Sequence, residues 1–236
     1  MPVLILFDID GTLVRFKPGL TRKLFSRMSA ELFGSGIPEG VIPRFAGMTD
    51  LQILKIVAGS IGVSQQELSE KLNDIWEKMI TIYRPYSTPQ YISIMPGIKD
   101  LLQLLNDEDN IHLGLITGNF ERNAYMKLRS HNLDTIFKYG GFGDDDEDRN
   151  NLPLIAIERA NKFNSTSHFT PENTLIVGDT LRDIECAHIN NIKVLSVATG
   201  EFGFDELLLG KPDLLLKDFS DFNRTKEEIS KLLKIN

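Results

Sequence analysis

The 236-residue sequence has few of the residues that mark secreted or nucleic-acid-binding proteins. Its single cysteine, Cys186, cannot form an internal disulfide, and nothing favours an oxidising compartment. Lys and Arg number 26 against 33 Asp and Glu, for a formal net charge of -7. This balance argues against a basic nucleic-acid footprint and against a polybasic membrane surface. We therefore expect a cytoplasmic protein that binds neither nucleic acid nor membrane.

Long apolar runs are also lacking. No stretch approaches the roughly 20 apolar residues that a membrane span requires. The run from Val3 to Phe7 has no basic flank and ends at Asp8, so it does not resemble a signal peptide. The chain is 42% hydrophobic and 25% charged, which is typical of a globular protein with one large domain or two of moderate size.

Short apolar runs alternate with helical patterns over most of the chain. The runs lie at 3–7, 111–117, 174–178, 193–197 and, more weakly, 213–216. Such runs are typical of strands in a sheet that helices cover on both faces. Helical spacing of apolar residues occurs at 97–105, 153–163 and 181–190. The alternation predicts an α/β fold with a doubly wound parallel sheet, that is, a Rossmann-like core.

Residues 15–91 break this alternation. Apolar residues recur there at helical spacing, as in the series Leu20, Leu24, Met28 and Leu32. We interpret this region as an α-helical domain inserted after the first strand, so that 1–14 and 92–236 form the core.

Two pairs of acidic residues follow predicted strands. Asp8 and Asp10 stand two residues apart where the first strand ends, and Gly11 allows an abrupt turn after them. Asp179 and Asp183 stand four apart at a helix start and share one face of that helix. Ligands of open α/β sheets bind beyond the carboxyl ends of the strands, where these four carboxylates would gather. Their repulsion predicts a Mg²⁺ ion among them, because Mg²⁺ prefers oxygen ligands.

A third strand end carries Thr117, Gly118 and Asn119. The Thr117 hydroxyl and the N–H groups that follow it could hold an anion at the start of the next helix. Asn119 could also simply cap that helix.

These segments, in this order and spacing, resemble the motifs of the haloacid dehalogenase-like hydrolase superfamily over essentially the whole chain. The segment Asp8-Ile9-Asp10-Gly11-Thr12 is similar to the first motif, DxDGT. The resemblance points to the branch with a helical cap, which includes phosphoglycolate phosphatases and beta-phosphoglucomutases. It implies that residues 15–91 are a mobile cap, which closes over the active site and sets substrate choice.

The resemblance also implies a role for each motif residue. Asp8 would be the nucleophile that forms an aspartyl-phosphate, and Asp10 the general acid and base. Mg²⁺ would be held by the Asp8 carboxylate, the Asp10 carbonyl and Asp179, with Asp183 in support through water. Thr117, with its neighbours Gly118 and Asn119, would bind the phosphoryl group.

The third motif usually supplies a lysine, and here the sequence departs from that pattern. Arg149 stands at the equivalent place, just before the helix that leads to the fourth strand. Its guanidinium could bridge the nucleophile and the phosphate oxygens. Lys138 and Lys162 are the alternatives.

Residues 44–50 resemble the loop with which the cap contacts the substrate. Arg44 and Thr49 are the predicted contacts. Thr49 or Asp50 could equally be an ordinary N-cap of the helix that begins near Leu51.

The function expected from these motifs is Mg²⁺-dependent hydrolysis of a small phosphorylated metabolite by a monomer or homodimer. A sugar-phosphate phosphomutase would share all the motifs and differ in how the cap excludes water. A binding or regulatory module without turnover is a third possibility, which loss of a motif acid would have favoured. No motif acid is lost.

Overall fold

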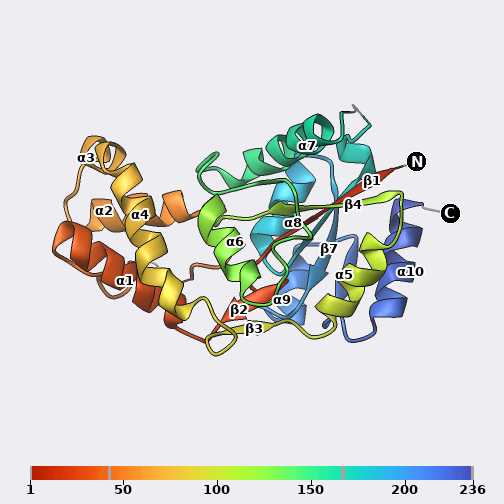
Figure 1. Ribbon diagram of the computed structural model, residues 1–236, viewed down its shortest axis with the longest axis horizontal. Helices are drawn as coiled ribbons and strands as arrows, with labels where there is room; N and C mark the ends of the chain where they lie inside the picture. The colour runs from red at the N-terminus through yellow and green to blue at the C-terminus, as the bar shows by residue number, and fades with distance from the viewer. Residues whose placement is uncertain (1, 42–43, 166–167, 235–236) are drawn as a thin grey trace.

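A six-stranded sheet forms the centre of the computed structural model, which describes residues 2–41, 44–165 and 168–234 (Figure 1). The strands run parallel in the order β5-β4-β1-β6-β7-β8. Their bounds are Val3–Phe7 (β1), Ile111–Ile116 (β4), Gly140–Gly141 (β5), Thr174–Gly178 (β6), Lys193–Val197 (β7) and Leu214–Leu216 (β8). The predicted α/β fold with a parallel, Rossmann-like sheet is confirmed.

The side chains of β1 enter two different hydrophobic cores. Val3, Ile5 and Phe7 join one core and Leu4 and Leu6 the other, because successive side chains of a strand point to opposite faces. All five are buried, which explains why the strand reads as a continuous apolar run instead of an alternating one.

Helices cover both faces of the sheet (Figure 1). The helices α7 and α8 contribute to the core that contains Leu4, whereas α5 and α10 contribute to the core that contains Ile5. The helices of this part of the chain are α5 (Ile98–Asn106), α6 (Glu121–Arg129), α7 (Leu152–Phe163), α8 (Leu181–Ile189), α9 (Phe204–Leu209) and α10 (Phe222–Leu233). Short 3-10 turns occupy Arg84–Tyr86, Arg149–Asn151 and Pro171–Asn173. None of the helices among the described residues is long and apolar enough to cross a bilayer.

Of the five α-helices that the structure describes between β1 and β4, four form a separate group beside the sheet (Figure 1). They are α1 (Leu20–Phe33), α2 (Asp50–Ser60), α3 (Gln65–Glu70) and α4 (Leu72–Tyr83). An antiparallel pair of short strands, β2 (Val14–Phe16) and β3 (Ile92–Ile94), carries the chain to this group and back. We call the group the cap. The predicted bounds of the cap, 15–91, begin within β2 and end one residue before β3, and they stay a prediction.

Gly97, at the start of α5, is a position that only glycine fits. Its φ is 74°, and a Cβ atom there would lie 1.8 Å from the carbonyl oxygen of Phe219. Gly62 has a similar φ of 80°, but a Cβ atom there would meet nothing within 4 Å. The two sites therefore share the left-handed backbone and differ in crowding.

Gly97→Ala should lower the Tm at least about twice as far as Gly62→Ala. The left-handed conformation costs both variants about 1 kcal/mol, and overpacking adds about 1–3 kcal/mol at Gly97 alone. One kcal/mol shifts the Tm of a chain of this size by about 2–4 °C. Thermal unfolding followed by circular dichroism measures the difference. Equal losses in the two variants would show that the contact with Phe219 does not constrain the fold.

Candidate active site

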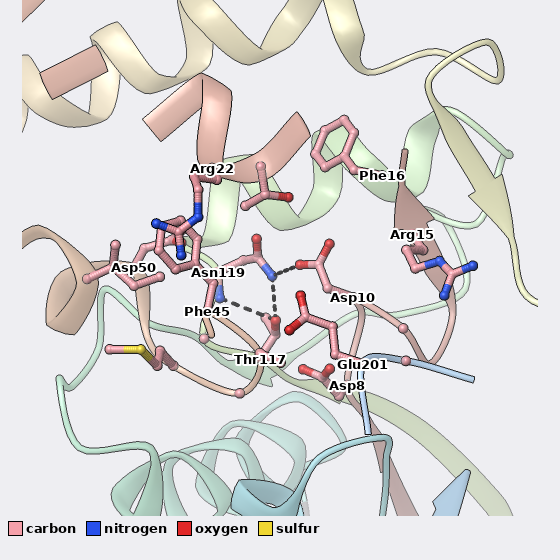
Figure 2. Close-up of a pocket in the computed structure, with 18 of the residues that line it drawn as sticks. Asp8, Asp10, Arg15, Phe16, Arg22, Phe45, Asp50, Thr117, Asn119 and Glu201 are labelled. Atoms are coloured by element: carbon pink, nitrogen blue, oxygen red, sulfur yellow. Dashed lines mark hydrogen bonds between the residues drawn. The ribbon is translucent and has the colours of Figure 1, made fainter. Parts of the chain in front are cut away.

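The order of the strands brings three motifs together at one edge of the sheet. β1 lies between β4 and β6, and all three run in the same direction. Asp8 follows β1, Thr117 follows β4 and Asp179 follows β6, so all three lie at neighbouring strand ends. Figure 2 shows Asp8 and Thr117 close together at this edge. The edge is the one at which parallel sheets bind their ligands.

Asp8, Asp179 and Asp183 form a compact acidic cluster. Each offers a carboxylate oxygen, and these oxygens lie within 4.8 Å of one another. Gly11 makes the close packing possible, because its φ is 96° and a Cβ atom there would lie 2.4 Å from Asp179 Oδ2. The Thr12 hydroxyl donates to Asp179 Oδ1 at 3.0 Å.

Burial disfavours the ionised form of the carboxyl groups in this cluster, because it removes them from water. Desolvation, with a further contribution from the neighbouring acids, raises the pKa of Asp8 to about 7. The same causes raise the pKa of Asp179 well above its usual range. Three buried oxygen donors of this kind fit a hard divalent cation such as Mg²⁺, which would stabilise their ionised forms. Asp10 does not contribute its carboxylate to this cluster, and the predicted role of its backbone carbonyl stays a prediction.

Arg149 is the cation that the structure brings to the cluster. Its Nη2 donates to Asp8 Oδ1 at 2.9 Å and to Asp183 Oδ1 at 2.5 Å. The Nε atom is buried and has no partner among the described residues, so it can still donate to an anion. Lys138 and Lys162, the alternatives for this position, are exposed and do not line the cavity.

Asn119 links the second motif to the first. Its Nδ2 donates to Asp10 Oδ2 at 2.6 Å and to Thr117 Oγ1 at 2.8 Å (Figure 2). It is not the cap of the next helix, because Phe120 occupies the N-cap position of α6. The amide instead holds Asp10 and Thr117 in a fixed relation.

Lys127 is a site residue that the motifs did not predict. It lies on α6 with only 2% of its side chain exposed, and its Nζ donates to Asp10 Oδ2 and Asn119 Oδ1, each at 2.5 Å. A usable signal was present in the sequence. Ala124 and Leu128 mark the buried face of an amphipathic helix, and a lysine on that face demands a partner.

The cap is docked on the core beside this network. Asp50 donates its N–H to the Gly118 carbonyl at 2.7 Å, and its Oδ2 accepts from the Phe120 N–H at 2.9 Å. The Trp76 ring stacks on Phe120 with centroids 4.8 Å apart and an interplanar angle of 19°. Cap and core therefore meet at the loop that carries Thr117 to Phe120.

The structure gives both predicted substrate contacts of the cap loop other partners. Thr49 is buried and acts as the N-cap of α2, since its side chain accepts from the Gln52 N–H and donates to the Glu147 carbonyl. Arg44 pairs with Glu206 at 3.2 Å and lies over the Phe202 ring. Neither Arg44 nor Thr49 lines the cavity. The N-cap alternative for Thr49 agrees with the structure, and substrate contact by Arg44 or Thr49 stays a prediction.

A cavity of about 290 Å³ lies between the acidic cluster and the cap. Arg22, Phe45 and Tyr83 contribute to its cap side, and the Arg22 guanidinium lies 4.7 Å from the centre of the Phe45 ring. The Tyr83 hydroxyl is buried without a partner among the described residues. Figure 2 shows Arg15 directed away from Asp10, so Arg15 is a rim residue. The predicted residues that line the cavity are Asp8, Asp10, Thr117, Gly118, Asn119, Arg149 and Asp179.

Comparison with known proteins identifies the family of the chain. The family model described as haloacid dehalogenase-like hydrolase matches residues 5–197. A phosphoglycolate phosphatase of Nitrosococcus oceani is 25% identical over 206 residues, which cover 84% of this chain and 85% of the relative. The pyrophosphatase PpaX of Anoxybacillus flavithermus is 25% identical over 221 residues, which cover 92% of this chain and 93% of the relative.

Solved structures share the fold. A beta-phosphoglucomutase of Clostridium difficile aligns with a TM-score of 0.72 at 18% identity, over 99% of each chain. A hydrolase of Pseudomonas syringae aligns with a TM-score of 0.70 at 22% identity, over 97% of this chain and 99% of its own. At these identities the likeness concerns the fold alone.

Mg²⁺ should stabilise the protein through the acidic cluster. An ion that binds only the folded state at about 100 times its Kd adds about 2.7 kcal/mol, or roughly 5–10 °C in Tm. Thermal unfolding with Mg²⁺ and with EDTA measures the shift. Asp179→Asn should lose most of it, while Asp107→Asn, a change at an exposed acid after α5, should keep it. A full shift in Asp179→Asn would place the ion elsewhere.

Asp50→Asn should become more stable relative to wild type as the pH rises. Burial raises the pKa of Asp50 from 3.8 to about 7, against the opposing effects of Lys127 and the Phe120 N–H. Between these values the folded state holds a proton that the unfolded state has released, so wild-type stability falls as the pH rises. Asparagine keeps an oxygen for the Phe120 N–H and does not titrate.

The measurement is the Tm of variant minus wild type at about pH 5 and about pH 8. The difference should grow between the two. Asp74→Asn, at an exposed acid on α4, serves as the control and should give a constant difference. A constant difference for Asp50→Asn as well would mean that the carboxyl group ionises normally.

Proposed function

Because the chain belongs to the haloacid dehalogenase-like hydrolases, we propose that it is a Mg²⁺-dependent phosphatase, which hydrolyses a small phosphomonoester through an aspartyl-phosphate on Asp8. The observation that supports this most directly is the surroundings of Asp8. Its carboxylate lies among the oxygen donors of Asp179 and Asp183, and one of its oxygens accepts from Arg149 at 2.9 Å. A nucleophile, a metal site and a fixed cation therefore share one small volume.

In the proposed reaction, an Asp8 oxygen attacks the phosphorus atom as the bond from phosphorus to the leaving-group oxygen breaks. Arg149 would bind the phosphoryl oxygens through its unpartnered Nε, and Thr117 through its hydroxyl. Mg²⁺, held by Asp8, Asp179, Asp183 and the Asp10 carbonyl, would neutralise charge on the transferring phosphoryl group.

Asp10 would move the protons. It would donate one to the departing oxygen of the substrate and later take one from the water that attacks the aspartyl-phosphate. That second step releases inorganic phosphate and restores the Asp8 carboxylate. The side chain of Asp10 is 36% exposed and lines the cavity, so both partners could reach it.

The substrate we propose is a small phosphomonoester whose leaving group carries a second anionic or polar group. The cavity volume of about 290 Å³ is at the lower end of the range for small-molecule sites, roughly 300–1,000 Å³. Arg22 and the unpartnered Tyr83 hydroxyl supply polar groups on its cap side. Phosphoglycolate, a phosphomonoester that the name of one relative contains, is the first compound to test, and pyrophosphate, a phosphoanhydride suggested by the name of the other, is the comparison.

Asp8→Asn should abolish turnover of p-nitrophenyl phosphate, with a loss of at least about 10³-fold in kcat, because the amide cannot form the covalent intermediate. Released p-nitrophenolate is measured with Mg²⁺ and with EDTA. Asp107→Asn should keep wild-type rates. Near-normal activity in Asp8→Asn, or in wild type with EDTA, would contradict the proposal.

The same preparations separate the other functions. Conversion of a sugar phosphate to its isomer without phosphate release would indicate a phosphomutase. No turnover of any compound in a phosphometabolite panel would indicate a binding module. The predicted monomer or homodimer stays a prediction.

A further inference from the structure

We propose that Lys127 is a positioning residue, which fixes the carboxyl group of Asp10 for proton transfer to the leaving group. The inference rests on the role proposed above for Asp10. Lys127 lies outside the segments that resemble the family motifs. Its contact with Asp10 joins α6 to the loop that follows β1.

Lys127 occupies an unusual position for a lysine. Its side chain is only 2% exposed, although lysine is among the residues least often buried. Removing an ammonium group from water costs several kcal/mol, so an apolar residue would serve better if this position only had to fill the core. The position is one where a buried helix face meets the reaction cavity.

The ammonium group has well-defined partners there. Its Nζ lies 2.5 Å from Asp10 Oδ2 and 2.5 Å from Asn119 Oδ1. The centre of the Phe16 ring, on β2, lies 5.2 Å from Lys127 Nζ, so the ring covers this nitrogen on another side. A long, flexible side chain is thus confined between a carboxylate, an amide and an aromatic ring.

Lys127 and Asn119 donate to the same oxygen of Asp10. The Asn119 amide reaches Oδ2 at 2.6 Å, and Lys127 reaches it at 2.5 Å. Among the described residues, none donates to Oδ1. With Oδ2 held by two donors, Oδ1 is the oxygen that carries the proton to or from the substrate.

Two different cations therefore serve the two acids of the first motif. Arg149 contacts Asp8 and Asp183, whereas Lys127 contacts Asp10 and makes no ion pair with Asp8. Loss of Lys127 should impair proton transfer from Asp10 to the leaving oxygen, while the ion pair that holds the Asp8 carboxylate stays in place. Small displacements of a reacting group can cost about 10²-fold in rate.

Proton transfer to the leaving oxygen can be tested by comparing substrates that differ only in their leaving group. As the Asp8 oxygen bonds to phosphorus, the bond to the leaving oxygen breaks, and that oxygen takes the proton of Asp10. p-Nitrophenolate is a stable anion that needs little protonation, whereas the phenolate of phenyl phosphate is a much poorer leaving group. A defect in proton delivery therefore affects phenyl phosphate more.

The experiment compares kcat/KM for the two aryl phosphates in wild type, Lys127→Met and Lys127→Arg. Lys127→Met should lose at least about 30-fold on phenyl phosphate and less than about 3-fold on p-nitrophenyl phosphate, consistent with a misplaced acid. Lys127→Arg should recover part of the loss, because it keeps a charged donor. Lys99→Met, at an exposed position on α5, should match wild type. The ratio between the two substrates does not depend on how much of the variant folds.

A double-mutant cycle completes the test. If Lys127 acts through Asp10, Lys127→Met should have little further effect on phenyl phosphate in an Asp10→Asn background. Equal losses on both substrates would assign Lys127 a structural role or direct contact with the phosphoryl group, and would overturn the inference. No loss on either substrate would overturn it as well. Absence of Mg²⁺-dependent turnover in wild type would instead refute the proposed phosphatase function.

Discussion

The mutual repulsion of Asp8, Asp179 and Asp183 is the constraint on which the rest of the site depends. Their carboxylate oxygens lie within 4.8 Å of one another in a buried place, where charge is poorly screened. Folding brings them together only because the parallel sheet fixes the ends of β1 and β6 side by side. Arg149 offsets part of the repulsion through ion pairs with Asp8 and Asp183. A divalent cation would offset the rest, so the charge that makes the cluster unfavourable without a metal would also make it a metal site.

A second electrostatic group lies between this cluster and the cap. Lys127 pairs with Asp10, and its charge also acts on Asp50, the cap residue that accepts from the Phe120 N–H. Phe120 in turn stacks on Trp76 of the cap. The segment from Thr117 to Phe120 therefore touches Asp10 on one side and the docked cap on the other. Movement of the cap would change the surroundings of Asp10 as well as access to the cavity.

Much of the core and of the acidic cluster could be predicted from the sequence. Buried parallel strands produce apolar runs that are visible without a structure, and five of the six sheet strands follow from them. β5 is only Gly140–Gly141, and two glycines give no pattern. Asp8 and Asp179 could be found because they directly follow strands, so their meeting place depends on topology alone.

Contacts between the cap and the core were much harder to predict, because they depend on how the cap docks on the core. Arg44 and Thr49 lie in a loop that resembles a substrate-binding segment, yet one pairs with Glu206 and the other caps α2. Lys127 was missed for a related reason. Its importance depends on the side chain of Asp10, which is 117 residues away in the sequence. A lysine on a buried helix face can be recognised from periodicity, but its partner cannot.

The two cations also show why a family motif does not define a whole active site. A motif names residues that lie at strand ends, where the backbone fixes their positions. Arg149 does not lie at a strand end, but the short 3-10 turn before α7 likewise fixes its backbone where the side chain reaches Asp8. Lys127 reaches the site from the last turn of α6 through a long side chain, and Phe16 and Asn119 confine it there. A helix can present such a residue from several positions without altering the strands, so residues of this kind have to be found from the structure of each chain.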